Sequence, residues 1–468
     1  MSRSQSGLGP AGLALAGLAA GRTSGRALVE RSLERIERAD GVVNAVIKLD
    51  PEGALRAADR MGEADTHGPL LGLPLLVKET EDAIGFATTH GSMLFRDTPP
   101  AFRDSSSVAA FRAAGSVVLG KTNCSEFAWE GHSWNRLFGA TLNPWDVRRS
   151  PGGSSGGSAA ALAAGMVPLA TATDAGGSTR TPAAQCGLLG LKPSGGTLSC
   201  EGQPGELDQL TTGLLAGHPS DLRLVHAALL TGGSSPTRPR VERIGVERIE
   251  LRRRLVGEAA LDDAVGIMLA AVSAQLQELA ARLGVVFSVV DAPVFVEVTP
   301  DDDALANLAL DLMSFLGRRT IADHEDVLDP SIVCGIRGVE NLSLDDYLAL
   351  RRRRLAYRDR LDAALESTLI VTPTLTVEGL YADGTAVNHG SAMLLPQSTT
   401  NTNIHNWTGH PALSLPAGEF PSGLPFGIQM TVSRFGDETL LDLADAWYEM
   451  FPWPLVARGY EPYWAPDD

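Results

Sequence analysis

Two serines and one lysine have surroundings in this chain that could support nucleophilic chemistry. Ser154 lies in the run PGGSSGGS, and Ser178 follows 24 residues later in the run TDAGGSTR. Upstream, Lys78 ends the apolar run LGLPLLVK. Glycines beside a serine let backbone N–H groups crowd around a small reacting group. A serine nucleophile needs such donors for the oxyanion that it creates, and it also needs a base.

Lys78 is the candidate base, although a lysine can accept a proton only when its amine is neutral. The ordinary pKa of a lysine is about 10.4, and lowering it to near 7 requires about 4 to 5 kcal/mol, which burial can supply. The leucines and valine before Lys78 offer such apolar surroundings. Considered alone, Lys78 is better explained as an exposed surface lysine. The two serine loops are what favour a catalytic role.

The composition predicts a folded protein with a large core and little affinity for nucleic acid. The chain has 468 residues, of which 44% are hydrophobic and 20% charged. This length suits one large domain or two to three ordinary ones. With 56 acidic and 39 basic residues the net charge is −17 at pH 7, and such a field repels phosphate backbones.

Cysteine usage and apolar runs favour a cytoplasmic protein. The four cysteines show no CxxC pair, which suits a reducing compartment. No apolar run approaches the roughly 20 residues of a membrane span. Residues 8–20 resemble a short signal-peptide core, but Pro10 interrupts them, and we expect a helix that packs on the body. No metal-ligand spacing such as HExxH occurs among the scattered histidines, so no metal or cofactor is expected.

Helical and extended patterns alternate along the whole chain. In the first half, helices are expected at residues 24–38, 51–61, 105–114 and 158–164, and strands at 44–48, 117–119 and 167–173. In the second half, helices are expected at 259–283, 342–365 and 438–450, and strands at 285–290, 368–374 and 427–430. This alternation predicts an α/β fold with a largely buried sheet.

Two further segments have a simple structural explanation. Residues 234–239 are rich in Ser, Pro and Thr and predict a break at the surface. The four arginines at 351–354 are surrounded by aspartates, so we expect a solvated helix face rather than an anion site.

The run GSVVLGKT at residues 115–122 matches the phosphate-binding pattern GxxxxGK[ST]. That chemistry needs a loop of exposed N–H groups between a strand and a helix. Here the middle residues are Val-Val-Leu, which predict a strand, and a helix is expected before the first glycine. The order of elements is inverted, so we do not expect nucleotide binding.

Two alternative roles for Ser154 stay open from the residues alone. The run GGSSG also fits the nucleophile-elbow pattern GxSxG, with Ser154 as nucleophile and His410 as a base further along the chain. That role leaves Lys78 and the second glycine loop unused. The Gly/Ser run could also be a flexible linker, although Pro151 and an alanine-rich helix bound it closely.

Taken together, these segments strongly resemble the amidase signature family. The resemblance rests on Lys78 after GLP, on GKTN followed by Glu126, on both glycine loops, and on GLLGLKP at residues 187–193. It covers residues from about 20 to 235 well, and the later runs GHPALSLP and GLPFGIQ match more loosely. The order and spacing make this match far more specific than the phosphate-loop or elbow patterns.

The resemblance implies a role for each member of a catalytic triad. Ser178 would be the nucleophile that accepts the acyl group, and Lys78 would be the ultimate base. Ser154 would bridge the two; in the family a cis peptide bond links it to the preceding residue, here Gly153. In such a relay Ser154 takes the proton of Ser178 and passes its own to Lys78.

The resemblance also implies the residues around the triad. The oxyanion hole would be formed by backbone N–H groups of the nucleophile loop, at Ala175, Gly176, Gly177 and Ser178. The supporting residues would be Gly153, Ser155, Asp174 and Arg180. The expected substrate contacts are Ala128 and Trp129, which come just after the element that runs from Asn123 to Glu126.

The chain departs from the family pattern after Pro193. The family usually continues with a threonine and a later Gly-Arg, whereas this chain has SGGT. The family's Asp-x-x-Gly-Pro element with a later arginine appears as DQLTTGLLAGH from Asp208, without the proline and the arginine. These features are mainly architectural, so they put the subfamily in doubt and leave the chemistry intact.

The expected architecture is a single large α/β domain over residues 1–468. Its sheet should be mixed, mostly parallel and twisted, with helices on both sides. Residues from about 65 to 235 would form the catalytic core, and those from about 240 to 400 a variable region around a substrate tunnel. Residues 401–468 would return to the core.

The implied function is hydrolysis of carbon–nitrogen bonds in small amides through a serine acyl-enzyme. Anilides, esters and carbamates (urethanes) are further substrate classes, because activities of this kind occur in the family. The expected partner is a small-molecule substrate, with no nucleic acid and no membrane, and a homodimer is one option for the oligomeric state. The alternatives are a glutamine-dependent amidotransferase A-type subunit with an obligate partner, a binding protein without activity, and a histidine-dependent esterase using Ser154.

Overall fold

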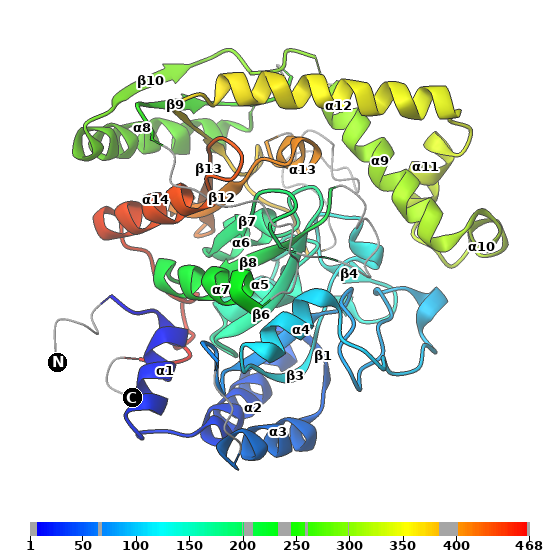
Figure 1. Cartoon of the computed structure of the whole chain (residues 1–468), viewed down its shortest axis with the longest axis vertical. Coiled ribbons are helices and arrows are strands. Elements are labelled where there is room, and N and C mark those ends of the chain that lie inside the picture. The colour runs from blue at the N-terminus through cyan, green and yellow to red at the C-terminus, as the bar shows by residue number, and fades with distance from the viewer. Residues whose placement is uncertain are drawn as a thin grey trace.

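An eleven-stranded sheet runs through the whole molecule in this computed structural model (Figure 1). The structure describes residues 7–63, 68–198, 200, 209–232, 245–257, 261–297, 299–382 and 401–465. Across the sheet, the strand order is β1 (Val46–Leu49), β3 (Val117–Thr122), β2 (Pro74–Lys78), β6 (Leu169–Asp174), β8 (Thr211–Ala216), β7 (Leu189–Lys192), β12 (Ala412–Glu419), β13 (Pro425–Thr431), β11 (Thr368–Pro373), β9 (Arg248–Arg252) and β10 (Val286–Val290). A separate small hairpin pairs β4 (Trp134–Asn135) with β5 (Gly139–Ala140).

Helices cover both faces of this sheet. The described helices are α1 (Pro10–Ala19), α2 (Gly25–Val43), α3 (Pro51–Glu63), α4 (Ser106–Ala113), α5 (Gly156–Ala163), α6 (Arg180–Cys186), α7 (Pro219–Gly232), α8 (Asp263–Leu283), α9 (Thr299–Leu316), α10 (Arg318–Asp323), α11 (Pro330–Val339), α12 (Leu344–Ala364), α13 (Asn403–Thr408) and α14 (Asp437–Met450), with short 3-10 turns η1 (Met93–Phe95) and η2 (Glu126–Ala128). The neighbours α1, α4, α7, α14 and α8 form one layer, and α2, α5 and α6 form another. In Figure 1, α1 to α3 lie at one end of the molecule and α8 to α12 at the other.

The prediction of a single α/β domain with a mixed sheet between helices is confirmed, but its detail that most strands are parallel is wrong. Among the described strands, six of the ten neighbouring pairs are antiparallel. Parallel pairing requires a long crossover, whereas antiparallel strands can be joined by a short turn. The β12–β13 hairpin, joined by residues 420–424, shows why: its short turn leaves no room for a crossover helix. The finer division into core, tunnel region and return stays a prediction.

Alternation along β2 places apolar side chains in two cores. Leu75 and Val77 belong to the core that contains α7 and α14, whereas Leu76 belongs to the core that contains α2 and α5. Successive residues of a strand point to opposite faces, so a central strand covered on both sides must be apolar throughout. The strand therefore carries Lys78, its last residue, into the interior.

The expected helices and strands are present, with boundaries shifted by a few residues. Ser24 caps α2 by accepting the N–H of Ala27, and α4 ends before Gly115, whose φ is 98°. The phosphate-loop pattern forms strand β3 after helix α4, which is the inverted order that excludes a phosphate loop. The predicted surface break at residues 234–239 lies outside the described residues, as does Asp208.

The amino-terminal helix α1 packs on the body, as predicted. The carboxylate of Asp221 on α7 accepts the N–H groups of Ala11 and Gly12, each at 3.0 Å. These N–H groups belong to the first turn of α1 and have no partner inside their own helix. A side chain from α7 thus fixes the start of α1.

One described helix, α8, is long and apolar enough to cross a membrane by length and composition. It packs as a core helix in this structure. Val265, Val272, Leu276 and Leu279 on one of its faces are fully buried, and α8 contacts β9 and β12. A buried core helix meets the same criterion as a membrane span, so its packing explains its composition.

The expectation of a solvated arginine face on α12 is only half right. Arg353 binds the carboxylate of Asp303 on α9 with two hydrogen bonds at 2.7 and 2.5 Å. Arg354 donates to the backbone oxygen of Trp407 at 2.5 Å and lies over its ring. Two of the four arginines therefore tie α12 to α9 and α13, because aspartate and carbonyl partners on those helices face the run.

Gly213 on β8 allows a close approach that a side chain would prevent. A Cβ at this position would lie 1.8 Å from Oγ1 and 2.8 Å from Cβ of Thr179. We predict that Gly213→Ala lowers the free energy of unfolding by about 1–3 kcal/mol, because overpacking forces neighbouring groups to move. Urea unfolding measures this change.

Gly266 on α8 is the matched control, because a Cβ there meets nothing within 4 Å. Gly266→Ala should stabilise the protein by up to about 1 kcal/mol through helix propensity. Equal effects of the two substitutions would contradict the packing described around Gly213.

Candidate active site

The side chain of Lys78 is fully buried at the carboxyl end of β2. Its Nζ lies 2.7 Å from Ser154 Oγ, 2.9 Å from Ser155 Oγ and 2.8 Å from Thr173 Oγ1. A protonated amine has three N–H groups to donate, and these three hydroxyls accept all of them. A neutral amine has one lone pair, which can instead accept a proton from a hydroxyl. The site thus suits both states of Lys78.

Burial lowers the pKa of Lys78 to about 8, and the nearby carboxylates of Glu81 and Asp174 oppose that shift. Desolvation disfavours the charged form of an amine. With a pKa of about 8, about a tenth of Lys78 is uncharged at pH 7 and about half at pH 8, and this fraction is able to act as a base.

The turn from Gly153 to Ser155 brings two hydroxyls to the amine. The peptide bond between Gly153 and Ser154 is cis. A Cβ on Gly153 would lie 2.2 Å from the backbone oxygen of His132, so only glycine fits at this crowded position. Ser155 also contacts the second loop, because its N–H donates to the backbone oxygen of Ser178 at 3.1 Å. The two glycine loops of the sequence are therefore in direct contact.

Ser178 lies in the turn between β6 and α6, and its side chain is partly exposed. Within the described part of the chain, no hydrogen bond joins its hydroxyl to that of Ser154. The structure brings Lys78 and Ser154 into contact and places Ser178 on the adjacent loop. A proton relay among the three requires the hydroxyl of Ser178 to come within hydrogen-bonding distance of Ser154 Oγ.

A buried ion pair braces the loop that carries Ser178. Arg180 binds Asp174 with hydrogen bonds at 2.9 and 3.0 Å, and both side chains are fully buried. Burial alone would raise the pKa of Asp174, but Arg180 outweighs it and holds that pKa well below its usual range. The charged pair therefore persists at all ordinary pH values.

The same carboxylate engages one of the N–H groups expected to form the oxyanion hole. Asp174 accepts the N–H of Gly177 at 2.8 Å and that of Thr179 at 3.2 Å. The N–H of Gly177 is thus engaged inside the loop and does not face an oxyanion in this structure. Among the described residues, the N–H groups of Ala175 and Gly176 have no acceptor, and both residues are partly exposed. These two donors are free to meet a ligand oxygen.

The carboxy-terminal segment completes the bracing of the loop, which the sequence did not reveal. Arg180 also donates to Oδ1 of Asn406 at 2.6 Å and to Oε1 of Gln429 at 2.7 Å. The hydroxyl of Thr402 donates to the backbone oxygen of Gly176 at 2.7 Å. The loose match of residues 409–429 to the family was the only sequence signal for this contact.

Thr173 and Thr171 were also missed, although a signal exists. They alternate along β6, LATATD, in an otherwise apolar buried strand. Two polar residues at a spacing of two on one side of a central strand are unusual and require partners. Thr173 meets the amine of Lys78, and Thr171 accepts the backbone N–H of Lys78 at 2.9 Å.

The elbow interpretation of Ser154 lacks its base. His410 is fully buried, and its ring nitrogens lie 2.8 Å from Thr408 Oγ1 and 2.9 Å from Asp362 Oδ1. Both nitrogens are therefore occupied by partners that do not include Ser154. In the described segments, no group of three or more His, Cys, Asp or Glu is arranged to hold a metal ion.

The expected substrate contacts, Ala128 and Trp129, lie at a strained turn. Phe127 and Ala128 both have positive φ values, 49° and 58°. The ring of Trp129 packs against α11, where a Cβ on Gly335 would lie 2.5 Å from it. Glu126 fixes this contact, since its carboxylate accepts the N–H of Asp329 just before α11 at 2.7 Å. Substrate contact by Ala128 and Trp129 stays a prediction.

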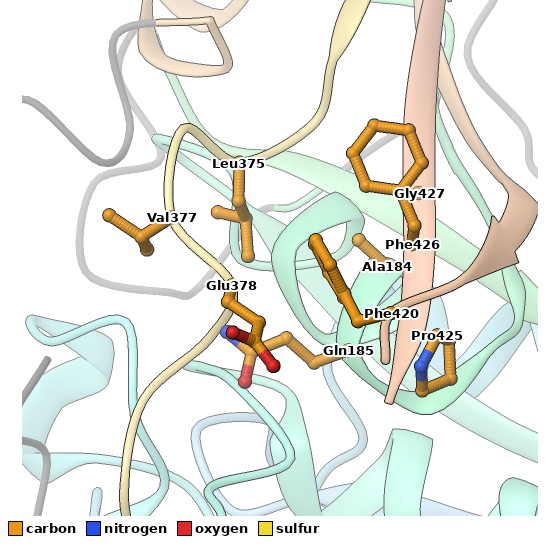
Figure 2. A pocket seen from close by; sticks show the side chains of 9 residues that line it. All are labelled: Ala184, Gln185, Leu375, Val377, Glu378, Phe420, Pro425, Phe426 and Gly427. Atoms are coloured by element: carbon orange, nitrogen blue, oxygen red, sulfur yellow. The ribbon is translucent and has the colours of Figure 1, made fainter. Parts of the chain in front are cut away.

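A small pocket lies beside Ala184 and Gln185, near the carboxyl end of α6 (Figure 2). Figure 2 shows Gln185 and Glu378 facing each other beside the apolar side chains of the pocket. Its lining contains none of the predicted catalytic residues. The lining residues are Ala184, Gln185, Leu375, Val377, Glu378, Phe420, Pro425, Phe426 and Gly427.

Comparison with known proteins identifies the family. A family model described as Amidase matches residues 27–248 and 260–441. The chain belongs to the amidase signature family. The buried lysine, the adjoining cis-linked serine and the braced glycine loop therefore occur in an amidase fold.

The relatives of this amidase differ in what they do. A curated relative from Thioalkalivibrio sulfidiphilus, the A-type subunit of a glutamyl-tRNA(Gln) amidotransferase, is 33% identical over 95% of this chain and 98% of its own. A second relative of the same name, from Roseiflexus castenholzii, is 33% identical over 93% of this chain and 94% of its own. A solved 6-aminohexanoate cyclic dimer hydrolase in complex with substrate is 26% identical, with a TM-score of 0.80 over 94% of this chain and 97% of its own.

The pKa of Lys78 predicts how the reactivity of Ser178 depends on pH. A neutral amine is needed to accept the proton, so the rate of labelling by an aryl sulfonyl fluoride should rise through about pH 8 and then level off. Mass spectrometry of the intact protein follows the labelling. Ser178→Ala should remain unlabelled at every pH.

Lys78→Met tests whether the amine of Lys78 causes this pH dependence. It removes the titrating amine and should slow labelling by about 10²-fold or more. A labelling rate that rises through pH 8 in this variant would show that another group supplies the base.

Proposed function

We propose that this chain cleaves the carbon–nitrogen bond of a carboxamide through an acyl-enzyme on Ser178. The observation that carries the proposal is the hydrogen bond between the buried amine of Lys78 and the hydroxyl of Ser154, 2.7 Å long. Among the described residues, hydroxyls and no carboxylate bind this buried amine, which suits it to lose its proton. The adjacent loop supplies the nucleophile.

In the first half of the reaction, Ser178 Oγ attacks the carbonyl carbon of the substrate. Its proton passes to Ser154 Oγ, and the proton of Ser154 passes to Lys78 Nζ. The carbonyl oxygen becomes an oxyanion, and the free N–H groups of Ala175 and Gly176 stabilise it. The carbon–nitrogen bond then breaks as the relay returns one proton to the leaving amine.

In the second half, water attacks the acyl group on Ser178 through the same relay. Water loses a proton toward Lys78, the new tetrahedral adduct collapses, and Ser178 leaves as its hydroxyl. The product is a carboxylic acid, and the enzyme returns to its starting state. No step requires an electron donor or a metal.

The proposed reaction does not specify one substrate. Any carbonyl with an adequate leaving group can form the acyl-enzyme, so anilides, esters and carbamates fall within the same chemistry. The structure neighbour named 6-aminohexanoate cyclic dimer hydrolase is a hydrolase. This supports a free-standing enzyme that acts on an organic amide.

The second candidate is the A-type subunit of a glutamine-dependent amidotransferase, and the curated relatives favour it. They share 33% identity with this chain along nearly its whole length, which is more than the 26% of the hydrolase neighbour. In this case the scissile bond is the side-chain amide of glutamine, and a partner protein receives the ammonia. The geometry of Lys78, Ser154 and Ser178 serves both functions.

A hydrolysis panel on the purified chain tests the proposed reaction. Alkyl and aryl amides, esters and carbamates should include at least one substrate that is turned over. Ser178→Ala should reduce kcat/KM by at least about 10³-fold, and Lys78→Ala by about 10² to 10⁴-fold. Retained amidase activity in both variants would overturn the mechanism.

Glutamine distinguishes the two candidates. The free-standing enzyme should hydrolyse anilides or alkyl amides without any partner, with little preference for glutamine. The amidotransferase component should be nearly inert on a simple anilide alone and should release ammonia from glutamine when its partner is present. Ammonia release and anilide hydrolysis, measured on the same preparation, decide between them.

A further inference from the structure

This chain contains few lysines, and most of them are buried. Only four of the 39 basic residues are lysines: Lys48, Lys78, Lys121 and Lys192. The last three of these are at most 1% exposed. Arginine thus carries the positive charge of the surface, and the buried lysines need a separate explanation.

A second set of buried charged residues lies close to Lys78. Glu79, Glu81 and Lys121 are all fully buried. Lys121 Nζ donates to the backbone oxygen of Glu81 at 2.6 Å and lies 3.5 Å from Glu79 Oε2. Buried charges are costly unless they are paired and hydrogen-bonded, so this set is a specific feature of the site.

Thr171 connects Glu81 to the candidate base. Its Oγ1 accepts the backbone N–H of Lys78 at 2.9 Å, and its own O–H donates to Glu81 Oε2. Ser107 donates to the other carboxylate oxygen of Glu81. Both carboxylate oxygens of Glu81 therefore accept a hydrogen bond from a hydroxyl, as in an ionised carboxylate.

The charges of this set balance when Lys78 is neutral. Glu79 lies between Lys121 and Lys48, with Lys48 Nζ at 3.8 Å from its Oε1. Burial raises the pKa of Glu81, but its hydroxyl partners and the nearby lysines oppose that shift. The negative charges of Glu79 and Glu81 cancel the positive charges of Lys48 and Lys121. Among the described residues, no carboxylate binds the amine of Lys78. The ionised Glu81 opposes the loss of the proton from Lys78 and so limits how far burial lowers its pKa.

The remaining titratable neighbours cannot take over this role. Burial raises the pKa of the Cys124 thiol to about 12 and lowers that of His90 to about 4, so both are neutral near pH 8. Asp174 also raises the pKa of Lys78, but its charge is paired with that of Arg180, and this pair does not involve Glu81. Asp82, which is half-buried, acts on Lys121 and His90 and not on Lys78.

We propose that Glu81 is a positioning residue of the catalytic site, which anchors the backbone of Lys78 through Thr171 and sets the pH at which that lysine becomes a base. The catalytic part of this proposal rests on the proposed function, whereas the contacts of Glu81 do not depend on that function. No substrate contact is attributed to Glu81.

The scarcity of lysine makes a direct test practical. Protein labelled with ¹³Cε-lysine contains only four labelled side chains, and the Lys78 resonance is assigned by its loss in Lys78→Met. Glu81→Gln keeps the shape and removes the charge. We expect the titration midpoint of Lys78 to fall by about one unit, as for the loss of a nearby opposite charge. An unchanged midpoint overturns the proposal.

Glu250→Gln is the matched control, because Glu250 is a buried carboxylate of β9 that pairs with Arg252. This variant should leave the midpoint of Lys78 at its wild-type value. A fall as large as that in Glu81→Gln would show a general effect of removing a buried acid and would overturn the proposal.

Thr171 provides a second route if Glu81→Gln does not fold. Thr171→Val removes the hydroxyl that serves both neighbours, so Glu81 should take up a proton and the midpoint of Lys78 should fall. Thr171→Ser keeps the hydroxyl and should restore the wild-type midpoint. Equal midpoints in the two variants would overturn the proposal.

The pH profile of kcat/KM separates this proposal from the proposed function. If the chain hydrolyses an amide or ester, the acid limb of Glu81→Gln should move to lower pH by the same interval as the midpoint. A purely structural role would lower the rate at all pH values and leave the limb in place. If the chain hydrolyses nothing, the proposed function fails, and the lysine titration still tests Glu81.

Discussion

The structure depends on keeping the amine of Lys78 buried, with three hydroxyls as its hydrogen-bond partners in the described part of the chain. Lys78 ends a central strand whose preceding residues are apolar and buried, so the chain can place it only inside. Desolvation disfavours the charged form of the amine, and its hydrogen bonds to three hydroxyl oxygens offset part of this unfavourable free energy. A carboxylate in their place would fix the charge and remove the base. Hydroxyls leave the amine able to lose its proton.

Distant segments cooperate to hold the two serine loops against this amine. The Gly153–Ser155 turn presses against the backbone of His132, where only glycine fits. The loop of Ser178 is held by the Asp174–Arg180 pair, and Arg180 reaches across to Asn406 and Gln429 near the carboxyl end. The first 180 residues thus supply the reactive groups, and the carboxy-terminal segment helps to fix the geometry of their loop.

Local patterns predicted much of this architecture, because their causes are local. The apolar run before Lys78, the serine cap of α2 and the glycine loops each specify their own conformation. Strand direction depends on contacts between distant segments, which explains why the sheet has more antiparallel pairs than expected. The engaged N–H of Gly177 could not be foreseen either, since it depends on where the Asp174 carboxylate points within its turn.

The bracing by Arg180 and the charges behind Lys78 were also beyond the reach of local patterns. In the sequence, Glu81 is a polar residue that follows an apolar run. Only the folded chain brings it into contact with Thr171 and Lys121. Arg180 was expected to brace the loop, but its partners near residue 406 are more than 200 residues away in sequence. Such buried polar networks are specified by the fold as a whole.

The most direct test of the account is to locate the acyl group during turnover. The tryptic peptide of residues 150–180 carries both Ser154 and Ser178, so a quenched reaction with a slow ester or anilide can be mapped by fragmentation of this one peptide. We predict an acyl group on Ser178 in the wild-type protein and no acyl group in Lys78→Met. An acyl group on Ser154, or equal acylation of Ser178 without the lysine, would contradict the relay.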